Sequence, residues 1–140
     1  MYTYEYPRPA LTADIMVFNT LCTEILLIRR GNEPFKNCWA FPGGFFDMSD
    51  RDIEHTAVRE LEEETGLVDI PLSEFCVASR EGRDPRGRTV TVVFTAQVNP
   101  DEVNPKGGDD AWEARWFPLD NLPPLAFDHD EIIGKWKAEQ

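Results

Sequence analysis

The segment Arg59-Glu60-Leu61-Glu62-Glu63-Glu64-Thr65-Gly66 closes the most regular helical pattern in the chain. Apolar residues recur every four positions up to this segment and within it, and the spacing predicts an amphipathic helix over Asp52–Thr65. Ser49 or Asp50 can cap the start of the helix, and Gly66 suits a left-handed cap at its end. The apolar stripe consists of Ile53, Ala57 and Leu61, with Val58 beside it.

Three carboxylates crowd one border of this stripe. At ~100° per residue, Glu60, Glu63 and Glu64 fall within an arc of roughly 100°. Like charges at this spacing destabilise a helix, and they do so more strongly where solvent is excluded. A hard divalent cation would offset the repulsion, because Mg²⁺ prefers a few carboxylates together with substrate phosphates. A solvated acidic helix face is the alternative, since glutamate is a strong helix former.

Two adjacent glycines, Gly43 and Gly44, precede the predicted helix. A backbone without side chains can approach the helix start closely, so that a carbonyl reaches a metal or an amide reaches a phosphate. A glycine pair before a helix with three carboxylates favours the metal-site interpretation over the solvated face.

The rest of the chain predicts an α/β fold in one domain. The order of elements is strands, one helix, strands and a last helix, which indicates a mixed sheet with helices packed on its faces. No repeat or linker divides residues 1–140. The predicted strands are Leu11–Phe18, Glu24–Arg30, Trp39–Phe41, Phe45–Asp47, Pro71–Arg80, Arg88–Val98 and Trp112–Phe117, and the last helix is Asp130–Ala138.

Composition and charge exclude several classes of function. The 14 basic and 26 acidic residues give a net charge of −12, which disfavours binding to nucleic acid or to an anionic membrane. No apolar run approaches the ~20 residues that span a bilayer, and the first residues lack a signal core. The scattered cysteines Cys22, Cys38 and Cys76 form no zinc motif and indicate a reducing compartment. We therefore expect a cytoplasmic protein.

Two stretches together resemble the Nudix hydrolase box. They are Trp39-Ala40-Phe41-Pro42-Gly43-Gly44-Phe45-Phe46-Asp47 and the run from Arg59 to Leu67. The box reads Gly, five residues, Glu, seven residues, then Arg-Glu-apolar-any-Glu-Glu-any-Gly-apolar, and its second half matches in full. In the first half the stretch from Gly44 to Arg59 is one residue longer, and Asp50 or Arg51 replaces the first Glu. The resemblance implies a single Nudix α/β/α sandwich around a mixed β-sheet.

The resemblance also implies roles for individual residues. Glu60, Glu63 and Glu64 would bind Mg²⁺ or Mn²⁺, with the Gly44 carbonyl as a further ligand. Arg59 would hold the glutamates in place through charge-assisted hydrogen bonds. The general base would be Glu63, Glu64 or an acid of the loop that carries Asp109, Asp110 and Glu113, of which we single out Asp110. A solvated loop is the alternative for those loop acids.

Two further stretches are similar to small ADP-ribose pyrophosphatases. They are Arg83–Val92 and Gly108–Phe117, with Leu125–His129 beyond them, and both stretches also occur in Nudix domains of NAD-linked transcription regulators. The similarity implies that the chain hydrolyses ADP-ribose to AMP and ribose 5-phosphate. Arg83 and Arg86 would contact phosphate or the terminal ribose, because a guanidinium suits phosphate oxygens. An ordinary solvated turn is the alternative.

Aromatic residues and histidines leave simpler interpretations open. Trp39, Phe41 and Phe127 can stack on adenine, although each also suits a core or rim position. We expect His55 and His129 to be surface or capping residues rather than metal ligands.

Three other functions stay open at this point. One is a nucleoside triphosphate pyrophosphatase that clears unwanted nucleotides. Another is a Nudix sensor domain that binds an NAD metabolite without cleaving it, and the third is an interaction domain with a solvated acidic helix. The expected partner is a nucleotide-sugar diphosphate, with no nucleic acid and no membrane. A homodimer is frequent in ADP-ribose hydrolases of this kind.

Overall fold

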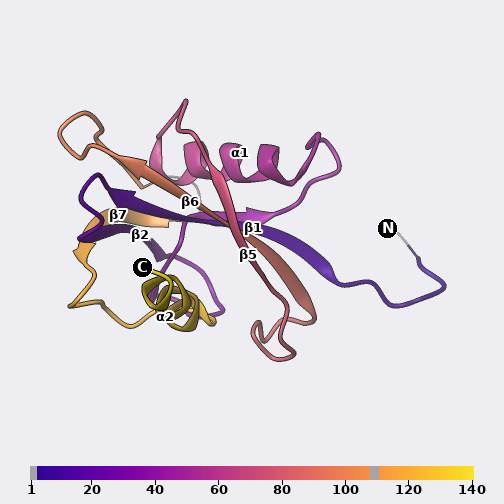
Figure 1. The fold of residues 1–140 in the computed structure, drawn as a ribbon. Helices are drawn as coiled ribbons and strands as arrows, with labels where there is room; N and C mark the ends of the chain where they lie inside the picture. Colours follow the sequence, from indigo (N-terminus) through magenta and orange to yellow (C-terminus); the bar gives the residue numbers. More distant parts are fainter. Residues whose placement is uncertain (1–2, 108–110) are drawn as a thin grey trace.

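The computed structural model describes residues 3–107 and 111–140 and is built around one long strand, β1 (Figure 1). β1 (Ala10–Asn19) pairs in parallel with β6 (Thr89–Val98) from Ala10↔Thr89 to Asn19↔Val98. Its other edge pairs with two strands in succession. These partners are β4 (Gly43–Phe45) and, further along, β2 (Glu24–Arg30), both antiparallel.

The sheet is mixed and follows the order β3-β2-β1-β6-β5, with β4 beside β1 and β7 beside β2. All pairs except β1–β6 are antiparallel. β1 therefore has β4 as a neighbour at Thr12–Asp14 and β2 as a neighbour at Val17–Phe18, so the sheet forks between these points. The remaining strands are β3 (Trp39–Ala40), β5 (Ser73–Ala78) and β7 (Ala111–Pro118).

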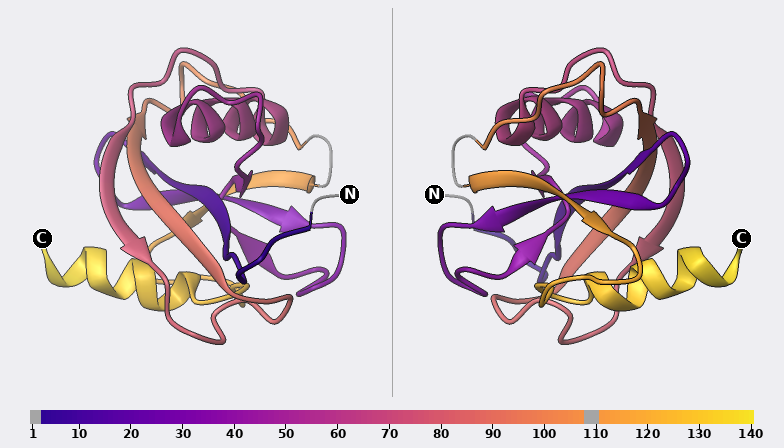
Figure 2. Two further views of the ribbon diagram at one scale, coloured as in Figure 1. Left: turned by 90° about the vertical axis from the view of Figure 1, so that its right-hand side faces the viewer. Right: turned by 90° about the vertical axis from the view of Figure 1, so that its left-hand side faces the viewer.

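Helices α1 (Ile53–Thr65) and α2 (His129–Ala138) cover opposite faces of the sheet (Figure 2). Successive residues of a strand point to opposite faces, so β1 supplies side chains to both cores. The core on the α1 side includes Ala13, Ile15, Val17, Leu26, Ala57, Leu61 and Phe94. The core on the α2 side includes Met16, Phe18, Ile25, Leu27, Val93, Ile132 and Ile133. This is the predicted α/β/α arrangement.

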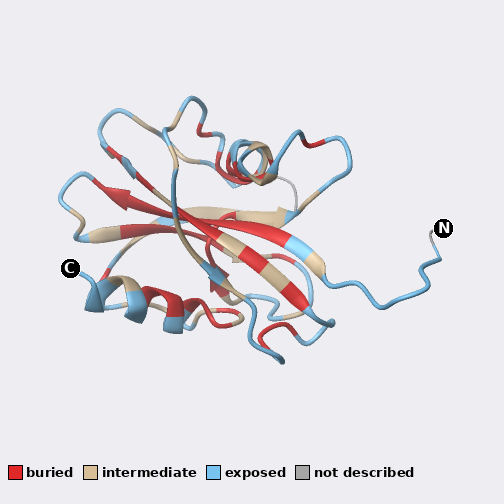
Figure 3. Ribbon diagram, turned by 45° about the vertical axis from the view of Figure 1, so that its right-hand side comes forward, coloured by how far each residue is buried: buried red, intermediate tan, exposed pale blue. Residues whose placement is uncertain are grey.

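Burial is concentrated in the middle of the sheet and on the inner faces of the two helices (Figure 3). Residues 3–9 are exposed and run away from the body of the fold before β1 begins. Each large apolar side chain buried in the two cores stabilises the fold by about 1.5–3 kcal/mol relative to its exposed state. The two apolar layers therefore fix the sheet, and the fork in it, as a rigid base for the site.

The predicted elements are present, with differences at their ends. α1 begins at Ile53, and Asp52 caps it by accepting a hydrogen bond from the His55 N–H at 2.8 Å, so the predicted caps Ser49 and Asp50 are wrong. The Asp50 carboxylate instead accepts a hydrogen bond from Arg59 Nε. The left-handed Gly66, with φ of 78°, ends the helix as predicted. No helix in residues 3–107 and 111–140 has the length and apolarity to cross a membrane.

Candidate active site

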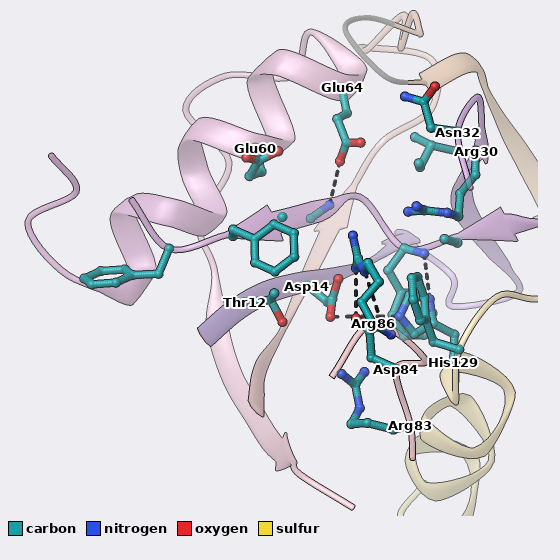
Figure 4. Close-up of a pocket in the computed structure, with 18 of the residues that line it drawn as sticks. Thr12, Asp14, Arg30, Asn32, Glu60, Glu64, Arg83, Asp84, Arg86 and His129 are labelled. Carbon is teal, nitrogen blue, oxygen red and sulfur yellow. Dashed lines mark hydrogen bonds and ion pairs between the residues drawn. The ribbon is translucent and has the colours of Figure 1, made fainter. Parts of the chain in front are cut away.

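A pocket of about 370 Å³ opens at the fork of the sheet (Figure 4). Its walls come from β1, β2 and β4, from α1, from the turn between β5 and β6, and from the segment that leads into α2. Glu60 and Glu64 reach it from the helix, and Asp14 and His129 line it from the sheet and from α2. The pocket therefore gathers residues that are far apart in the sequence.

Glu64 is buried against the backbone of β4. Its side-chain oxygen Oε1 accepts a hydrogen bond from the Gly43 N–H at 2.7 Å, and the residue is 7% exposed. Burial raises the pKa of the Glu64 carboxyl to about 8, although the Gly43 N–H acts in the opposite direction. A side chain at position 43 would collide with its neighbours, since a Cβ there would lie 2.3 Å from the Ala13 carbonyl oxygen and 2.4 Å from Asp14 Oδ1.

Gly44 allows an equally close approach to Glu60. A Cβ at position 44 would lie 2.5 Å from the carboxylate carbon of Glu60 and within 2.7 Å of both its oxygens. The predicted role of the glycine pair, a close approach of backbone to the acidic helix, is thus present in the fold. Two helix glutamates, Glu60 and Glu64, lie directly on β4 as a result.

Arg59 braces the loop before the helix. Its Nε and Nη2 donate to the two carboxylate oxygens of Asp50 at 3.0 and 2.9 Å. Its Nη1 donates to Glu60 at 2.8 Å and to Glu63 at 3.5 Å. The guanidinium holds the pKa of the Asp50 carboxyl well below its usual range, so Asp50 stays ionised and keeps Arg59 in place. Asp50 occupies the part of the sequence where the Nudix box has its first Glu.

Glu63 is more exposed than the other two glutamates. Its side chain is 40% exposed and does not line the pocket. Within the described ranges, no three His, Cys, Asp or Glu side chains are placed to enclose a metal ion. The donor set at the pocket nevertheless consists of hard oxygens, which suit Mg²⁺ or Mn²⁺. The high pKa of Glu64 shows the cost of a buried negative charge, which a cation would offset. The residues present therefore fit a hard divalent cation.

The predicted arginines both line the pocket, but their guanidinium groups are engaged with protein partners. Arg83 is buried and donates to both oxygens of Asp128, at 3.0 and 2.8 Å, at the start of α2. Arg86 donates to both oxygens of Asp84, at 3.1 and 2.8 Å. The Arg86 guanidinium carbon lies 4.8 Å from the Phe45 ring centre and 5.6 Å from that of Phe127. Arg86 and these rings form a rim of flat groups on the pocket.

The three aromatic residues proposed for adenine differ in position. Phe127 lines the pocket in a left-handed conformation with φ of 53°, a strained state for a bulky residue. Phe41 also lines the pocket, but it is 2% exposed and stacks on the His129 ring at 4.1 Å. Trp39 is 8% exposed, packs against the Phe117 ring at 4.7 Å, and is not brought to the pocket.

The pocket floor contains residues that the sequence analysis missed. Asp14 accepts a hydrogen bond from the Thr91 hydroxyl at 2.6 Å, and burial raises the pKa of its carboxyl to about 6. His129, expected to be a surface or capping residue, is 2% exposed and accepts the Phe41 N–H through Nδ1 at 3.1 Å. A lone aspartate within an apolar strand was the available signal for Asp14. His55 is half-buried and its Nδ1 accepts the Arg51 N–H, in keeping with a capping residue.

Of the acids around the start of β7, Glu113 lies within the described part of the chain. Asp109 and Asp110, the loop acids considered as general bases, lie outside the described residues. Glu113 is bound to Arg115 at 2.8 Å and to Arg29 at 3.5 Å and does not line the pocket.

Residues 8–138 match the NUDIX domain family. Among curated proteins, the ADP-ribose pyrophosphatase of Methanocaldococcus jannaschii is 45% identical over 135 residues, which are 94% of this chain and 77% of that protein. The ADPR responsive transcriptional repressor NtrR of Acinetobacter baylyi is 34% identical over 134 residues. That similarity spans 92% of this chain and 53% of the repressor.

Solved structures are similar over almost the whole chain. The NUDIX domain of Shewanella oneidensis NrtR complexed with ADP ribose has a TM-score of 0.86 and 31% identity, and covers 96% of this chain and 90% of that one. A bifunctional NMN adenylyltransferase/ADP ribose pyrophosphatase from Francisella tularensis, complexed with AMP and a Mn ion, has a TM-score of 0.80 and 28% identity. It covers 97% of this chain and 43% of the Francisella chain.

Proposed function

Because this chain belongs to the NUDIX domain family and is a Nudix pyrophosphohydrolase, we propose that it hydrolyses ADP-ribose to AMP and ribose 5-phosphate. The observation that carries the proposal is the similarity to the archaeal ADP-ribose pyrophosphatase along nearly the full chain. The pocket supports it, because one opening combines acidic groups for a cation with aromatic and arginine groups for a nucleotide. The NUDIX domain of NrtR, which binds ADP ribose, has the same fold.

The proposed metal ligands are Glu60, Glu63 and Glu64, with the Gly44 carbonyl as a further one. Glu60 and Glu64 already lie on the pocket, and their hard oxygens support Mg²⁺ or Mn²⁺ as the ion. The Mn ion in the related Francisella structure supports the same class of metal. A divalent cation bound there would lower the pKa of a water molecule and neutralise charge on the phosphoryl oxygens.

The chain's own residues prepare the site for this reaction. Arg59 orients Glu60, and the Gly43 N–H orients Glu64, so both carboxylates are held before substrate arrives. Glu63, Glu64 or Asp110 takes the proton from the attacking water as the general base. A general base must be unprotonated at the working pH, so the buried Glu64, with its pKa raised to about 8, could serve only where a bound cation lowers that pKa.

The substrate itself is placed by the other side of the pocket. Arg86 is fixed by Asp84 and presents its guanidinium toward the diphosphate. Phe127 and Phe45 offer flat faces at the rim for adenine. Phe41 stacks on His129, whose ring centre lies 5.5 Å from that of Phe127. The proposed substrate contacts of Arg83 and Trp39 would require each side chain to move from its protein partner, Asp128 and Phe117 respectively.

A sensor function is the second candidate. The similarity to an ADPR responsive repressor favours it, and so does the missing first Glu of the Nudix box. A sensor would bind ADP-ribose tightly without turning it over. The net charge of −12 argues against direct contact of this chain with DNA.

A substrate panel separates these functions. ADP-ribose, nucleoside triphosphates and other nucleoside diphosphate compounds are incubated with the protein and Mg²⁺ or Mn²⁺, and phosphate is measured after a phosphatase has acted on the products. We expect ADP-ribose to be the preferred substrate, with AMP and ribose 5-phosphate as the identified products. Preference for a triphosphate would replace the proposed substrate. Calorimetric binding of ADP-ribose without turnover would establish the sensor.

We place the activity in the cytoplasm. The three free cysteines Cys22, Cys38 and Cys76 support this, since free thiols persist in reducing compartments. The homodimer stays a prediction, which sedimentation analysis of the purified protein checks.

A further inference from the structure

The floor of the pocket carries a polar pair that the proposed reaction does not use. Asp14 projects from β1, and His129 opens α2 beside it (Figure 4). Both are almost fully buried, with exposures of 9% and 2%. His129 Nε2 and Asp14 Oδ2 are 3.9 Å apart, which is too far for a hydrogen bond between them.

The hydrogen-bond pattern determines which nitrogen of His129 carries the proton. Nδ1 accepts the Phe41 N–H at 3.1 Å, so this nitrogen is unprotonated. Burial lowers the pKa of the imidazole to about 3, and the ring is therefore neutral at physiological pH. A neutral ring with a bare Nδ1 has its hydrogen on Nε2. The stacked Phe41 ring, 7° from parallel, keeps this orientation fixed.

The Nε2–H group is directed into the pocket. In the described part of the chain, no hydrogen bond joins His129 Nε2 to a protein acceptor. In the same ranges, every buried side-chain nitrogen or oxygen has a hydrogen-bond partner. Because Nε2 has no such partner, it must be accessible to solvent. His129 lines the pocket, which makes the pocket the space that Nε2–H faces.

The same reasoning applies to Asp14. Its Oδ2 accepts the Thr91 hydroxyl at 2.6 Å, while Oδ1 has no hydrogen-bond partner among the described residues and lies close to Gly43. Its side chain is 12% exposed and lines the pocket. Oδ1 is therefore an open acceptor on a buried carboxylate whose other oxygen, Oδ2, lies 3.9 Å from His129 Nε2.

A donor beside an acceptor selects a particular kind of ligand. A phosphate would accept a hydrogen bond from the His129 Nε2–H, but the Asp14 carboxylate would repel it. A cation would be attracted by the carboxylate, but it cannot accept the hydrogen bond that Nε2–H offers. A hydroxyl both accepts and donates, so it satisfies both groups at once. We propose that Asp14 and His129 form a subsite for a sugar hydroxyl of the nucleotide substrate. This inference rests on the proposed function, because it assigns part of the same pocket.

The neighbouring ion pair makes the subsite rigid. Asp128 precedes His129 in the chain and holds Arg83 through two hydrogen bonds in a buried position. This pair fixes Asp128, the residue before His129, against the turn between β5 and β6, and so limits the movement of His129. A rigid pair discriminates by the chemistry of the ligand rather than by adapting to it.

The test compares variants of the pair on three ligands. Asn at position 129 keeps an acceptor for the Phe41 N–H but removes the Nε2–H donor. Asn at position 14 turns its oxygen to the Thr91 hydroxyl and presents NH₂ where Oδ1 was an acceptor. The variants are His129→Asn and Asp14→Asn, with His55→Asn, which does not line the pocket, as the matched control. The ligands are ADP-ribose, the β-methyl ester of ADP, and ADP-ribose made with 2′,3′-dideoxyadenosine.

Either sugar of ADP-ribose could supply the hydroxyl, and the ligands distinguish them. If the distal ribose binds there, His129→Asn and Asp14→Asn weaken ADP-ribose about tenfold, the value of one lost hydrogen bond, and leave the methyl ester unchanged. If the adenosine ribose binds there, ADP-ribose and the methyl ester weaken alike while the dideoxy ligand is unaffected. Both results support the subsite.

Loss on all three ligands by the same factor, or on none, overturns the subsite. The ratios are measured as kcat/KM and, independently, as Kd by calorimetry. If the wild-type protein binds but does not hydrolyse ADP-ribose, the proposed function fails while the Kd ratios still decide the subsite. Circular dichroism and thermal melts of each variant exclude a general loss of fold as the cause.

Discussion

Single side chains at the pocket carry most of the proposed chemistry, and Glu64 is the clearest of them. We expect Glu64→Gln to lower turnover by at least ~100-fold, because an amide is a poor metal ligand and a poor base. The fold should survive, since glutamine can still accept the Gly43 N–H. Steady-state kinetics with Mg²⁺, together with a thermal melt, make the measurement.

Glu62 on the same helix offers the matched control. Its side chain is exposed and away from the pocket, so Glu62→Gln changes the same charge without touching the site. Its turnover should stay at the wild-type level. Wild-type turnover in Glu64→Gln would remove Glu64 from the metal site.

His129 gives the stability of the protein a specific pH dependence. Burial lowers its pKa from 6.5 to about 3, so below pH 6.5 the unfolded chain binds a proton that the folded chain does not. The stability that the neutral histidine contributes is therefore fully present above pH 6.5. As the pH falls from 6.5 toward 3, the free energy of unfolding decreases by at most about 1.4 kcal/mol per pH unit. Asp14 has the opposite effect on stability. Its pKa is raised to about 6, so as the pH falls the folded state binds a proton on Asp14 before the unfolded state does.

Comparison with His129→Asn isolates the histidine, since Asp14 is present in both proteins. Between pH 7 and about pH 4.5, the wild type should lose about 2–3 kcal/mol more free energy of unfolding than the variant. Urea denaturation at several pH values measures the difference. Parallel pH profiles for the two proteins would show that His129 does not remain neutral in the folded state.

Residue patterns predict some of this site and necessarily miss the rest. Gly43, Gly44 and the acidic helix are close in sequence, so spacing alone brings them together. Asp14 and His129 depend on partners from distant parts of the chain. The Thr91 hydroxyl is 77 positions from Asp14, and the Phe41 amide is 88 positions from His129. Only the tertiary fold reveals that these polar groups are buried and facing the pocket.

At the scale of elements, the start of α1 shows a competition between neighbouring caps. Asp52 has an extended backbone and accepts the His55 N–H, which satisfies one of the open amides of the first turn. Asp52→Ala should lower the free energy of unfolding by about 1 kcal/mol, while Asp52→Asn should retain most of the stability that the cap contributes. Denaturation with urea measures both. Equal stability of the alanine variant would show that another residue caps the helix.

The choice among Ser49, Asp50 and Asp52 could not be made from sequence. All three residue types are good caps, and they lie within one turn. Asp50 is taken out of the competition by Arg59, nine positions along the chain, through a bidentate hydrogen-bonded pair. The element itself was predictable because a long apolar stripe and a terminal glycine identify a helix without tertiary information.

At the scale of the molecule, the Arg83–Asp128 pair ties the turn between β5 and β6 to the start of α2. Both side chains are buried, at 3% and 7% exposure, so removing one leaves an uncompensated charge. Asp128→Ala should therefore destabilise the protein by about 3–5 kcal/mol. The double variant Arg83→Met with Asp128→Leu should lose less free energy of unfolding than the sum of the losses in Arg83→Met and Asp128→Leu alone. Chemical denaturation of the set measures the coupling, and simple additivity would contradict it.

The layer order of the molecule was predictable, and its fork was not. Alternating apolar strands and amphipathic helices predict helices on both faces of a mixed sheet, as observed. The change of partner along β1, from β4 at Thr12–Asp14 to β2 at Val17–Phe18, follows from strand pairing over long distances. The pocket depends on this fork, so its position appears only in the folded molecule.

β1 is held by hydrogen bonds on both edges, with β6 along one side and β4 and β2 along the other. Its amides should consequently be among the last in the protein to exchange with deuterated solvent, at a rate close to that of global unfolding, while the exposed residues 3–9 exchange early. The site therefore rests on the most slowly opening part of the molecule. Binding residues on β1 are therefore difficult to substitute without loss of the fold, whereas changes in the loops around the pocket can alter specificity at little cost in stability.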